Sequence, residues 1–301
     1  MKLSIVIGTY NRLDQIKRCV ESIFLQTKTA LKVYITDAGS SDGTVEYLQS
    51  IASDVVVPVL VGKKMGQAKA YNDVFKVVDT PYVAWLSDDN EVINGALDTA
   101  VRILESDPAI GMVALKTRDK QGPFVGAPYI GGISAAGILN VNQGVLPTPL
   151  LQGIGGFSEE FRDYGIDQAL TAEVLKTGCK VVYTKVIALN HYRNWSEDPK
   201  SENYQWLKER QARAKKLYLE IYGEKLSPQQ MSFKIKSTLG RLLKETLLKH
   251  GLHSFVRTNR YCRDLFNILY GKHISIFDSL ISIGKDYHLT QSKYNEINKS
   301  N

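Results

Sequence analysis

Continuous apolar runs alternate with segments of helical periodicity along the first half of the chain. The apolar runs predict buried strands, and hydrophobic residues three or four positions apart predict helices. Strands are expected at residues 3–8, 31–36, 54–61 and 82–86, and helices at residues 13–26, 45–51, 66–78 and 95–105. Strands that are apolar throughout are typical of a parallel sheet covered on both faces. The pattern therefore predicts a doubly wound α/β domain with a mostly parallel sheet.

The second half of the chain follows a less regular pattern. Residues 122–156 contain nine glycines and four prolines without a sustained helical period. We expect loops and short strands there, which either shape a substrate pocket or serve as plain connections. Beyond them, the sequence predicts helices at residues 167–177 and 201–222 and a strand at residues 180–184.

Composition narrows the class of protein. With 301 residues, of which 44% are hydrophobic, the chain can bury one large core or two modest ones. We find no apolar run of about 18 residues, and the apolar start is too short for a signal peptide, so neither a membrane-spanning helix nor secretion is expected. Three widely spaced cysteines argue against a disulfide framework. The cytoplasm is the predicted location.

The positive charge is concentrated near the C-terminus. Residues 232–272 hold nine basic and two acidic side chains, so this segment carries the whole net charge of +7. The nearly neutral main body makes nucleic acid an unexpected partner. Phe233, Leu239 and Leu243 recur among these charges as in a basic amphipathic helix. This helix either attaches peripherally to an anionic membrane surface or packs on the rest of the protein with a solvated basic face.

The first candidate for chemistry is the sequence Ser87-Asp88-Asp89-Asn90, which directly follows a predicted strand. Ligands bind at the carboxyl ends of strands in open α/β sheets. Two adjacent carboxylates repel each other, and a divalent cation relieves that repulsion. The alternative is a turn or a helix cap, for which Asp and Asn are equally suited.

Several short motifs occur in an order that resembles the family 2 glycosyltransferases of GT-A fold. The resemblance covers roughly residues 3–195, and it implies transfer of a sugar from a nucleotide-diphosphate sugar, with inversion and with divalent Mg²⁺ or Mn²⁺. Five weak motifs in the right order make a strong signal. They are Thr9-Tyr10-Asn11-Arg12, the Asp37 to Thr44 loop, Gly66-x-x-x-Ala70-x-Asn72, Ser87-Asp88-Asp89, and Gly155-Gly156-Phe157-Ser158-Glu159 followed by Asp167 and His191.

The resemblance assigns the metal and the base. Asp89 matches the family's metal-binding carboxylate, and His191 matches a histidine that binds metal or diphosphate. Ser87 replaces the usual first carboxylate, so Asp88 contacts either ribose or the metal through water. Asp167 is the candidate base that takes the acceptor proton. A helix N-cap is its alternative role, and one residue can serve both.

The remaining candidates belong to the donor pocket. Asp37 is expected to accept a hydrogen bond from a pyrimidine base, with an Asx turn as the alternative. Arg12 either contacts phosphate or is solvated, and Asn72 either binds the donor or holds its helix near the sheet. Thr9 and Tyr10 resemble residues that line the base pocket.

The expected partners follow from this assignment. They are a UDP- or dTDP-linked sugar donor and a carbohydrate or lipid-linked glycan acceptor. The predicted division is a GT-A catalytic domain at residues 1–222, with a donor half to about 118 and an acceptor half from about 119, followed by a helical extension at residues 223–301. A nucleotidyltransferase and a non-catalytic nucleotide-sugar-binding protein remain alternative functions.

Overall fold

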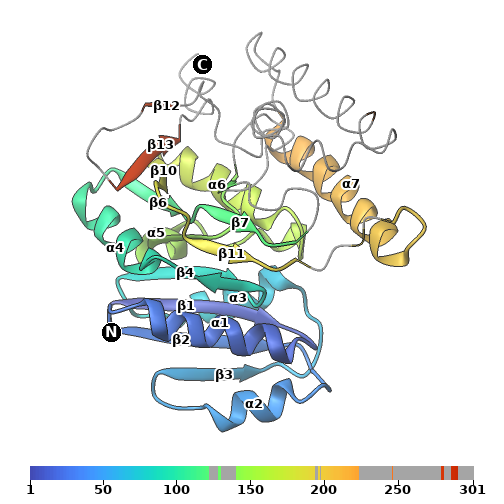
Figure 1. Ribbon diagram of the computed structural model, residues 1–301. Coiled ribbons are helices and arrows are strands. Elements are labelled where there is room, and N and C mark those ends of the chain that lie inside the picture. The colour runs from blue at the N-terminus through green and yellow to red at the C-terminus, as the bar shows by residue number, and fades with distance from the viewer. Residues whose placement is uncertain are drawn as a thin grey trace.

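The computed structural model describes residues 1–121, 128–129, 140–193, 196, 198–223, 246, 279–280 and 286–290. The predicted amphipathic helix within residues 232–272 lies almost entirely outside these residues, as does most of the glycine-rich segment at 122–156. The described part is a layered α/β structure in which helices cover a central sheet (Figure 1).

The first half of the chain alternates strands and helices, as the periodicity predicts. Its ends differ from the predicted ones by a few residues because capping and turn residues extend or shorten each element. The elements are β1 (Leu3–Thr9), α1 (Leu13–Gln26), β2 (Leu31–Asp37), α2 (Thr44–Ser50), β3 (Val56–Leu60), α3 (Gln67–Phe75), β4 (Tyr82–Ser87), β5 (Asn90–Val92) and α4 (Ala96–Ser106).

The second half contains more short strands than the sequence indicates. The one helix within residues 122–156 that the structure describes, α5, spans only six residues, which is too short to produce a periodic signal. The elements are β6 (Ile110–Ala114), β7 (Thr117–Asp119), β8 (Pro128–Tyr129), β9 (Gly144–Pro147), α5 (Thr148–Gly153), a 3₁₀ turn (Glu159–Phe161), α6 (Ile166–Lys176), β10 (Lys180–Thr184), β11 (Leu189–His191), α7 (Glu202–Tyr222), β12 (Ser279–Leu280) and β13 (Tyr287–Thr290).

The main sheet is mostly parallel. Its strand order is β12-β13-β10-β6-β9-β4-β1-β2-β3. Strand β9 is antiparallel to both neighbours, and β13 is antiparallel to β10. The predicted fold class is confirmed, and the reversed central strand is a feature that hydrophobic periodicity does not reveal.

Two hydrophobic cores explain why the strands are apolar throughout. Helices α1, α2 and α4 pack on one face of the sheet, and α3, α5, α6 and α7 pack on the other. In β1, Ile5 and Ile7 belong to the first core and Val6 belongs to the second. Because successive side chains point to opposite faces, a sheet covered on both sides requires apolar residues at every position.

A second, smaller sheet has the strand order β5-β11-β7-β8. Its middle strand β11 pairs with β5 on one side and with β7 on the other. In this register His191 lies opposite Asn90 of β5 and opposite Asp119 of β7. The small sheet thus brings together three segments that are far apart in the sequence.

The C-terminal region contributes a strand to the main sheet. Strand β13 extends the edge at β10, with Tyr287 opposite Thr184. Tyr287 is 4% exposed and belongs to the core beneath α4. The neighbouring Asp286 accepts a hydrogen bond from Arg102 Nε at 3.1 Å. The division at residue 222 stays a prediction, although β13 belongs to the same sheet as strands β1 to β4.

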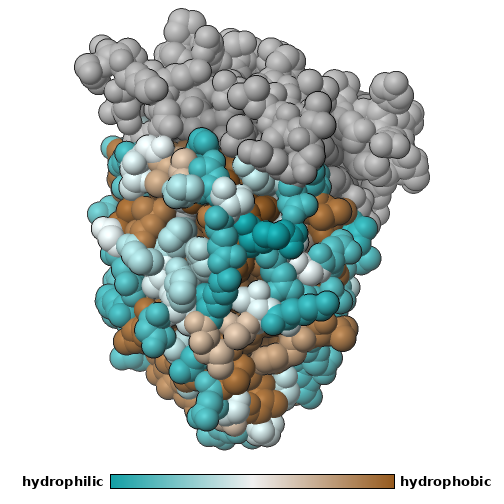
Figure 2. Space-filling model, turned by 90° about the vertical axis from the view of Figure 1, so that its left-hand side faces the viewer, coloured by the Kyte–Doolittle hydropathy of each residue, from teal (hydrophilic) through white to brown (hydrophobic). Residues whose placement is uncertain are grey.

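The outer surface carries polar and apolar residues side by side. Hydrophilic and hydrophobic residues are interspersed on the described part of the face in Figure 2. Among the helices that the structure describes, none combines the length and the hydropathy that crossing a bilayer requires.

Replacing Tyr287 by Ala should lower the free energy of unfolding by about 3 kcal/mol, because it empties a buried aromatic site. Arg102→Ala is the matched control and should cost less than about 1 kcal/mol, because its ion pair is exposed. Urea denaturation of both variants measures the difference. Equal, small losses would show that β13 adds nothing to the stability of the sheet.

Candidate active site

Three strands place candidate residues at one edge of the main sheet. Strands β1, β2 and β4 are parallel, with Thr9 opposite Asp37 and Gly8 opposite Ser87. Asp88 follows β4 directly, so its carboxylate starts from the same edge. This is the carboxyl end of the parallel strands, where open α/β sheets bind their ligands.

Tyr71 of α3 joins β1 and β4 immediately before this edge. Its hydroxyl accepts a hydrogen bond from Gly8 N and donates one to Leu86 O, both at 2.7 Å. A Cβ on Gly8 would lie 2.7 Å from the Tyr71 ring, so this position requires glycine. A fully buried tyrosine therefore sets the spacing of the two strands from which the candidate residues emerge.

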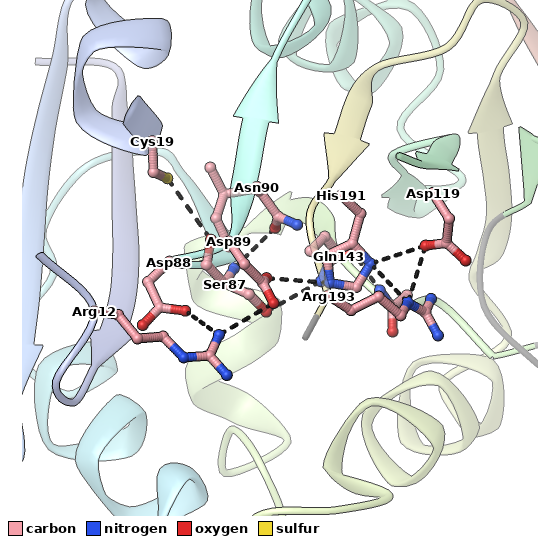
Figure 3. A network of polar contacts seen from close by, with 12 residues as sticks. Arg12, Cys19, Ser87, Asp88, Asp89, Asn90, Asp119, Gln143, His191 and Arg193 are labelled. Carbon is pink, nitrogen blue, oxygen red and sulfur yellow. Dashed lines mark hydrogen bonds and ion pairs between the residues drawn. The ribbon is translucent and has the colours of Figure 1, made fainter. Parts of the chain in front are cut away.

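The Ser87–Asn90 segment is a tight turn between β4 and β5. Asn90 Oδ1 accepts a hydrogen bond from Ser87 N at 2.9 Å and closes the turn. The turn interpretation is therefore correct for the backbone. Asp88 and Asp89 are nonetheless only 5% and 6% exposed, and their carboxylates take part in a polar network (Figure 3).

Arg12 is the cation that faces both carboxylates. Its Nη1 lies 3.0 Å from Asp88 Oδ1 and 3.2 Å from Asp89 Oδ2. Burial and the charge of Asp89 raise the pKa of Asp88, against the opposing charge of Arg12. Burial would also raise the pKa of Asp89, but the positive charges of His191 and Arg12 lower it. The carboxylates of Asp88 and Asp89, which are shielded from water, therefore both interact with the guanidinium group of Arg12.

His191 reaches Asp89 from the small sheet. Its Nε2 lies 3.1 Å from Asp89 Oδ1, and its Nδ1 lies 3.3 Å from Asp119 Oδ1. Burial would lower the pKa of His191, but the two carboxylates outweigh it and raise the pKa to about 9. Arg193 Nε, 2.9 Å from Asp119 Oδ1, balances the charge at the far end of the network.

The sequence does not single out Asp119 or Arg193. Asp119 closes a three-residue strand, and only the pairing of β7 with β11 places it beside His191. Arg193 stands two residues after His191 and could have been suspected from that spacing alone. The position of Asp119 follows from the pairing register of β7 and β11, which the sequence pattern does not reveal.

The chemistry of this network suits a divalent cation that keeps several waters. No cluster of three or more His, Cys, Asp or Glu side chains forms a metal cage within the described residues. Asp89 Oδ1 accepts no aligned hydrogen bond from any described residue, although it lies beside His191 Nε2. Mg²⁺ and Mn²⁺ sites often use one or two protein ligands and complete the shell with water and phosphate. Asp119 at Nδ1 supplies the partner that commonly orients a metal-binding histidine.

Asp37 caps its own loop. Its Oδ1 accepts hydrogen bonds from Gly39 N at 2.8 Å and from Ser40 N at 2.9 Å. This is the Asx-turn alternative, and contact with a nucleotide base stays a prediction. Tyr10 lies on the same rim, 39% exposed, with Lys64 Nζ 3.8 Å from its ring centroid.

Asn72 holds the Gly155–Gly156–Phe157 segment against α3. Its Nδ2 donates to Phe157 O, and its Oδ1 accepts from Phe157 N, both at 2.8 Å. A Cβ on Gly156 would collide with the Asn72 amide, so this close approach needs glycine. These contacts give Asn72 a structural role, but they join α3 to this segment and not to the sheet, and its role in donor binding stays a prediction.

Asp167 lies in the first turn of α6, where Gly165 occupies the N-cap position, so the cap alternative does not describe it. Burial raises the pKa of Asp167 to about 6. Asn140 Nδ2 donates to its Oδ2 at 2.9 Å, and Gln143, three residues further on, donates to Ser87 Oγ at 3.3 Å. The segment before β9 thus links the candidate base to the Asp88–Asp89 turn.

Sequence comparisons point to sugar-transferring enzymes. Residues 4–140 match the profile described as glycosyl transferase family 2. The uncharacterized glycosyltransferase YibD of Escherichia coli (strain K12) is 35% identical over 108 residues, covering 35% of this chain and 31% of YibD. The Escherichia coli protein named UDP-Glc:alpha-D-GlcNAc-diphosphoundecaprenol beta-1,3-glucosyltransferase WfaP is 27% identical over 105 residues, covering 35% of this chain and 42% of WfaP. The chain therefore spans less than half the length of these curated relatives.

Two solved structures share the fold over almost the whole chain. Residues 1–349 of S. aureus TarS superpose with a TM-score of 0.53 at 14% identity, covering 97% of this chain and 99% of that one. The mannosyltransferase PcManGT from Pyrobaculum calidifontis, in complex with GDP-Man and Mn²⁺, has a TM-score of 0.53 at 18% identity and covers 90% of this chain and 86% of its own. The predicted GT-A fold is confirmed.

The raised pKa of Asp167 predicts how stability depends on pH. The folded state binds this proton more tightly than the unfolded state, so ionisation between about pH 4 and 6 should cost about 1–3 kcal/mol of unfolding free energy. Asp167→Asn removes that cost and should become stabilising relative to wild type as pH rises to 7. Urea denaturation at several pH values measures the difference.

Asp98→Asn is a control of opposite sign. Hydrogen bonds from Lys28 and Thr29 overcome burial and lower the pKa of Asp98, so this variant should lose stability at neutral pH. A pH-independent difference between Asp167→Asn and wild type would contradict the assignment.

Proposed function

The chain carries a glycosyl transferase family 2 domain at residues 4–140, and on that premise we propose that it transfers a sugar, with inversion, from a nucleotide-diphosphate sugar to a carbohydrate or lipid-linked glycan. The observation that carries the proposal is the 3.1 Å contact between Asp89 and His191 at the carboxyl edge of the sheet. It unites a carboxylate pair, a histidine and two arginines where a diphosphate and its cation would need them.

Asp167 is the base in this proposal. With a pKa of about 6 it is mostly ionised at neutral pH, yet it is a stronger base than an ordinary aspartate. It takes the proton of the acceptor hydroxyl while that oxygen forms a bond to the anomeric carbon. The bond from this carbon to the diphosphate oxygen breaks on the opposite face, and the nucleoside diphosphate leaves with the electron pair.

Asp89 and His191 would hold the divalent cation, Mg²⁺ or Mn²⁺. When bound, such a cation stabilises the negative charge of the departing diphosphate. Asp119 keeps His191 in place through Nδ1. Arg12, whose side chain is 39% exposed, remains accessible to a phosphate while it faces Asp88 and Asp89. Asp88 completes the donor side as a contact to ribose or to a metal-bound water.

The donor is proposed to be a UDP- or dTDP-linked sugar. The support is Asp37 on the rim beside Thr9 and Tyr10, together with the UDP-glucose in the name of WfaP. PcManGT is in complex with GDP-Man, which contains a purine base. The test of the donor must therefore include GDP-sugars beside UDP- and dTDP-sugars. For the acceptor, the diphosphoundecaprenol in the name of WfaP supports a lipid-linked glycan.

Two substitutions separate metal binding from proton transfer. Asp89→Asn should lower metal-dependent turnover at least about a hundredfold by removing a charge beside the diphosphate. Asp167→Asn should lower kcat by about 10²–10⁴-fold with donor affinity unchanged, because a base acts mainly in the transition state. Turnover is measured as nucleoside diphosphate released from UDP-, dTDP- and GDP-sugars, and donor affinity by calorimetry.

Asp73→Asn is the matched control, since Asp73 is an exposed carboxylate on α3 that pairs with Lys69 and with Lys76 at the end of the helix. It should behave like wild type. Pyrophosphate instead of nucleoside diphosphate would identify a nucleotidyltransferase. Donor binding without turnover across a broad acceptor panel would indicate a non-catalytic protein. Wild-type turnover by Asp167→Asn would refute the base.

The protein is proposed to act at the cytoplasmic face of a membrane, held peripherally by its basic residues 232–272. Anionic vesicles should bind it at low salt and release it at about 1 M salt, where screening is strong. Arg241→Gln with Lys244→Gln should weaken binding by about tenfold or more, since each basic residue contributes about 1 kcal/mol. Lys17→Gln with Lys32→Gln is the control, and co-sedimentation is the measurement. Equal binding to neutral and anionic vesicles would contradict the proposal.

A further inference from the structure

Helix α7 presents a basic and aromatic edge next to its buried face. Leu207, Ala214 and Tyr218 pack into the core, as expected for an amphipathic helix. Trp206 and Arg210, four residues apart, lie on a neighbouring side, and Arg213 continues it one turn later. Trp206 is 55% exposed, which is unusual for a side chain that gains so much from burial.

Arg210 is the centre of this edge. Its guanidinium carbon lies 4.1 Å from the Trp206 ring centroid and 5.6 Å from that of Tyr164. One Nη lies 3.3 Å from Asp163 Oδ2. Its Nε is buried and has no hydrogen-bond partner within the described part of the chain. Arg210 thus lies close to two aromatic rings while part of its donor capacity stays unused.

Positive charge exceeds negative charge around Arg210. Burial lowers the pKa of Arg210, Asp163 opposes this, and the nearby charges of Arg213 and Arg162 lower it further. Arg162 has a backbone φ of 61°, a strained value for a residue other than glycine. Arg210 and Arg162 both face Asp163, with nitrogen–oxygen distances of 3.3 and 3.7 Å, and the charge of Arg213 acts on Arg210 as well. Positive charges therefore outnumber the one carboxylate that these two arginines contact.

Different residues connect Asp167 with the arginine cluster and with the Asp88–Asp89 turn. Tyr164 belongs to the loop that leads into α6, and burial raises its pKa, with a smaller contribution from the charge of Asp167. Gln211 of α7 donates to the Tyr164 hydroxyl at 3.1 Å. Asp167 is therefore linked to the Asp88–Asp89 turn through Asn140 and Gln143, and its charge also acts on Tyr164, whose ring Arg210 faces.

We propose that Arg162, Arg210 and Arg213 bind the diphosphate of a lipid-linked acceptor and that Trp206 stacks on a sugar ring of the same molecule. This rests on the proposed function, because it assigns the partner of the same reaction. Arginine forks match phosphate oxygens in pairs, and an exposed indole offers a flat apolar face to a sugar. The donor diphosphate has its own site at Asp88 and Asp89, so these arginines serve a second anionic group.

The test is a binding measurement with two synthetic ligands that share lipid and sugar. Farnesyl-diphospho-N-acetylglucosamine carries the diphosphate, and farnesyl N-acetylglucosaminide lacks it. Both are titrated by calorimetry into the full chain, with and without saturating UDP and Mn²⁺. Wild type should prefer the diphosphate ligand at least about tenfold, and UDP should not abolish this preference.

The variants assign the preference to the cluster. Arg213→Gln, at an exposed position that folding tolerates, and Arg210→Gln should each reduce it about tenfold. Trp206→Ala should weaken both ligands to a similar extent, because it removes the stacking surface alone. Lys215→Gln, an exposed charge on the same helix about 200° around from Arg213, is the control and should bind like wild type.

The outcomes separate this inference from the proposed function. Unchanged diphosphate preference in both arginine variants, or no preference in wild type, would overturn the cluster as a diphosphate site. A protein that shows the preference but binds no nucleotide would retain the cluster and lose the proposed donor chemistry. Nucleotide binding by Arg210→Gln and Arg213→Gln, together with a reduced preference for the diphosphate ligand in both, supports both.

Discussion

The contact between Asp89 and His191 is the constraint on which the rest of the site depends. It joins the turn after β4 to the end of β11, and the pairing of β5 with β11 holds these two segments in register. Each of these strands is only three residues long. Strands this short depend for their stability on the structure around them. The main sheet positions Asp89 through β4, and β7 positions His191 through its pairing with β11.

Burying this network would be costly if its charges were unmatched. Asp88 and Asp89 face Arg12, and Asp119 faces Arg193, with His191 between the two groups. Removal of one partner from such a network leaves an uncompensated buried charge, which costs far more than an exposed pair contributes. The matched charges hold these side chains in place, and under the proposed function a cation and a diphosphate would replace contacts that already exist.

The sequence predicts the parallel sheet and the helices on both faces because these follow from local periodicity. It also places Asp88, Asp89 and Thr9 at strand ends, where the structure finds them. Asp119 could not be predicted, because its position depends on which short strands pair. The reversed direction of β9 has the same cause. For Asn72, the motif left donor binding and a structural role open, and the structure shows that the oxygen and the nitrogen of its amide both bond to Phe157. Motif resemblance finds the residues, and only tertiary contacts distinguish the structural ones.

The most direct test of the central claim is a crystal structure with UDP and Mn²⁺, with the metal located by anomalous scattering. The account predicts one manganese peak within about 2–2.3 Å of both an Asp89 carboxylate oxygen and His191 Nε2, with the diphosphate completing the shell. Nucleotide bound with the Asp89–His191 ion pair intact, and manganese elsewhere or absent, would contradict it.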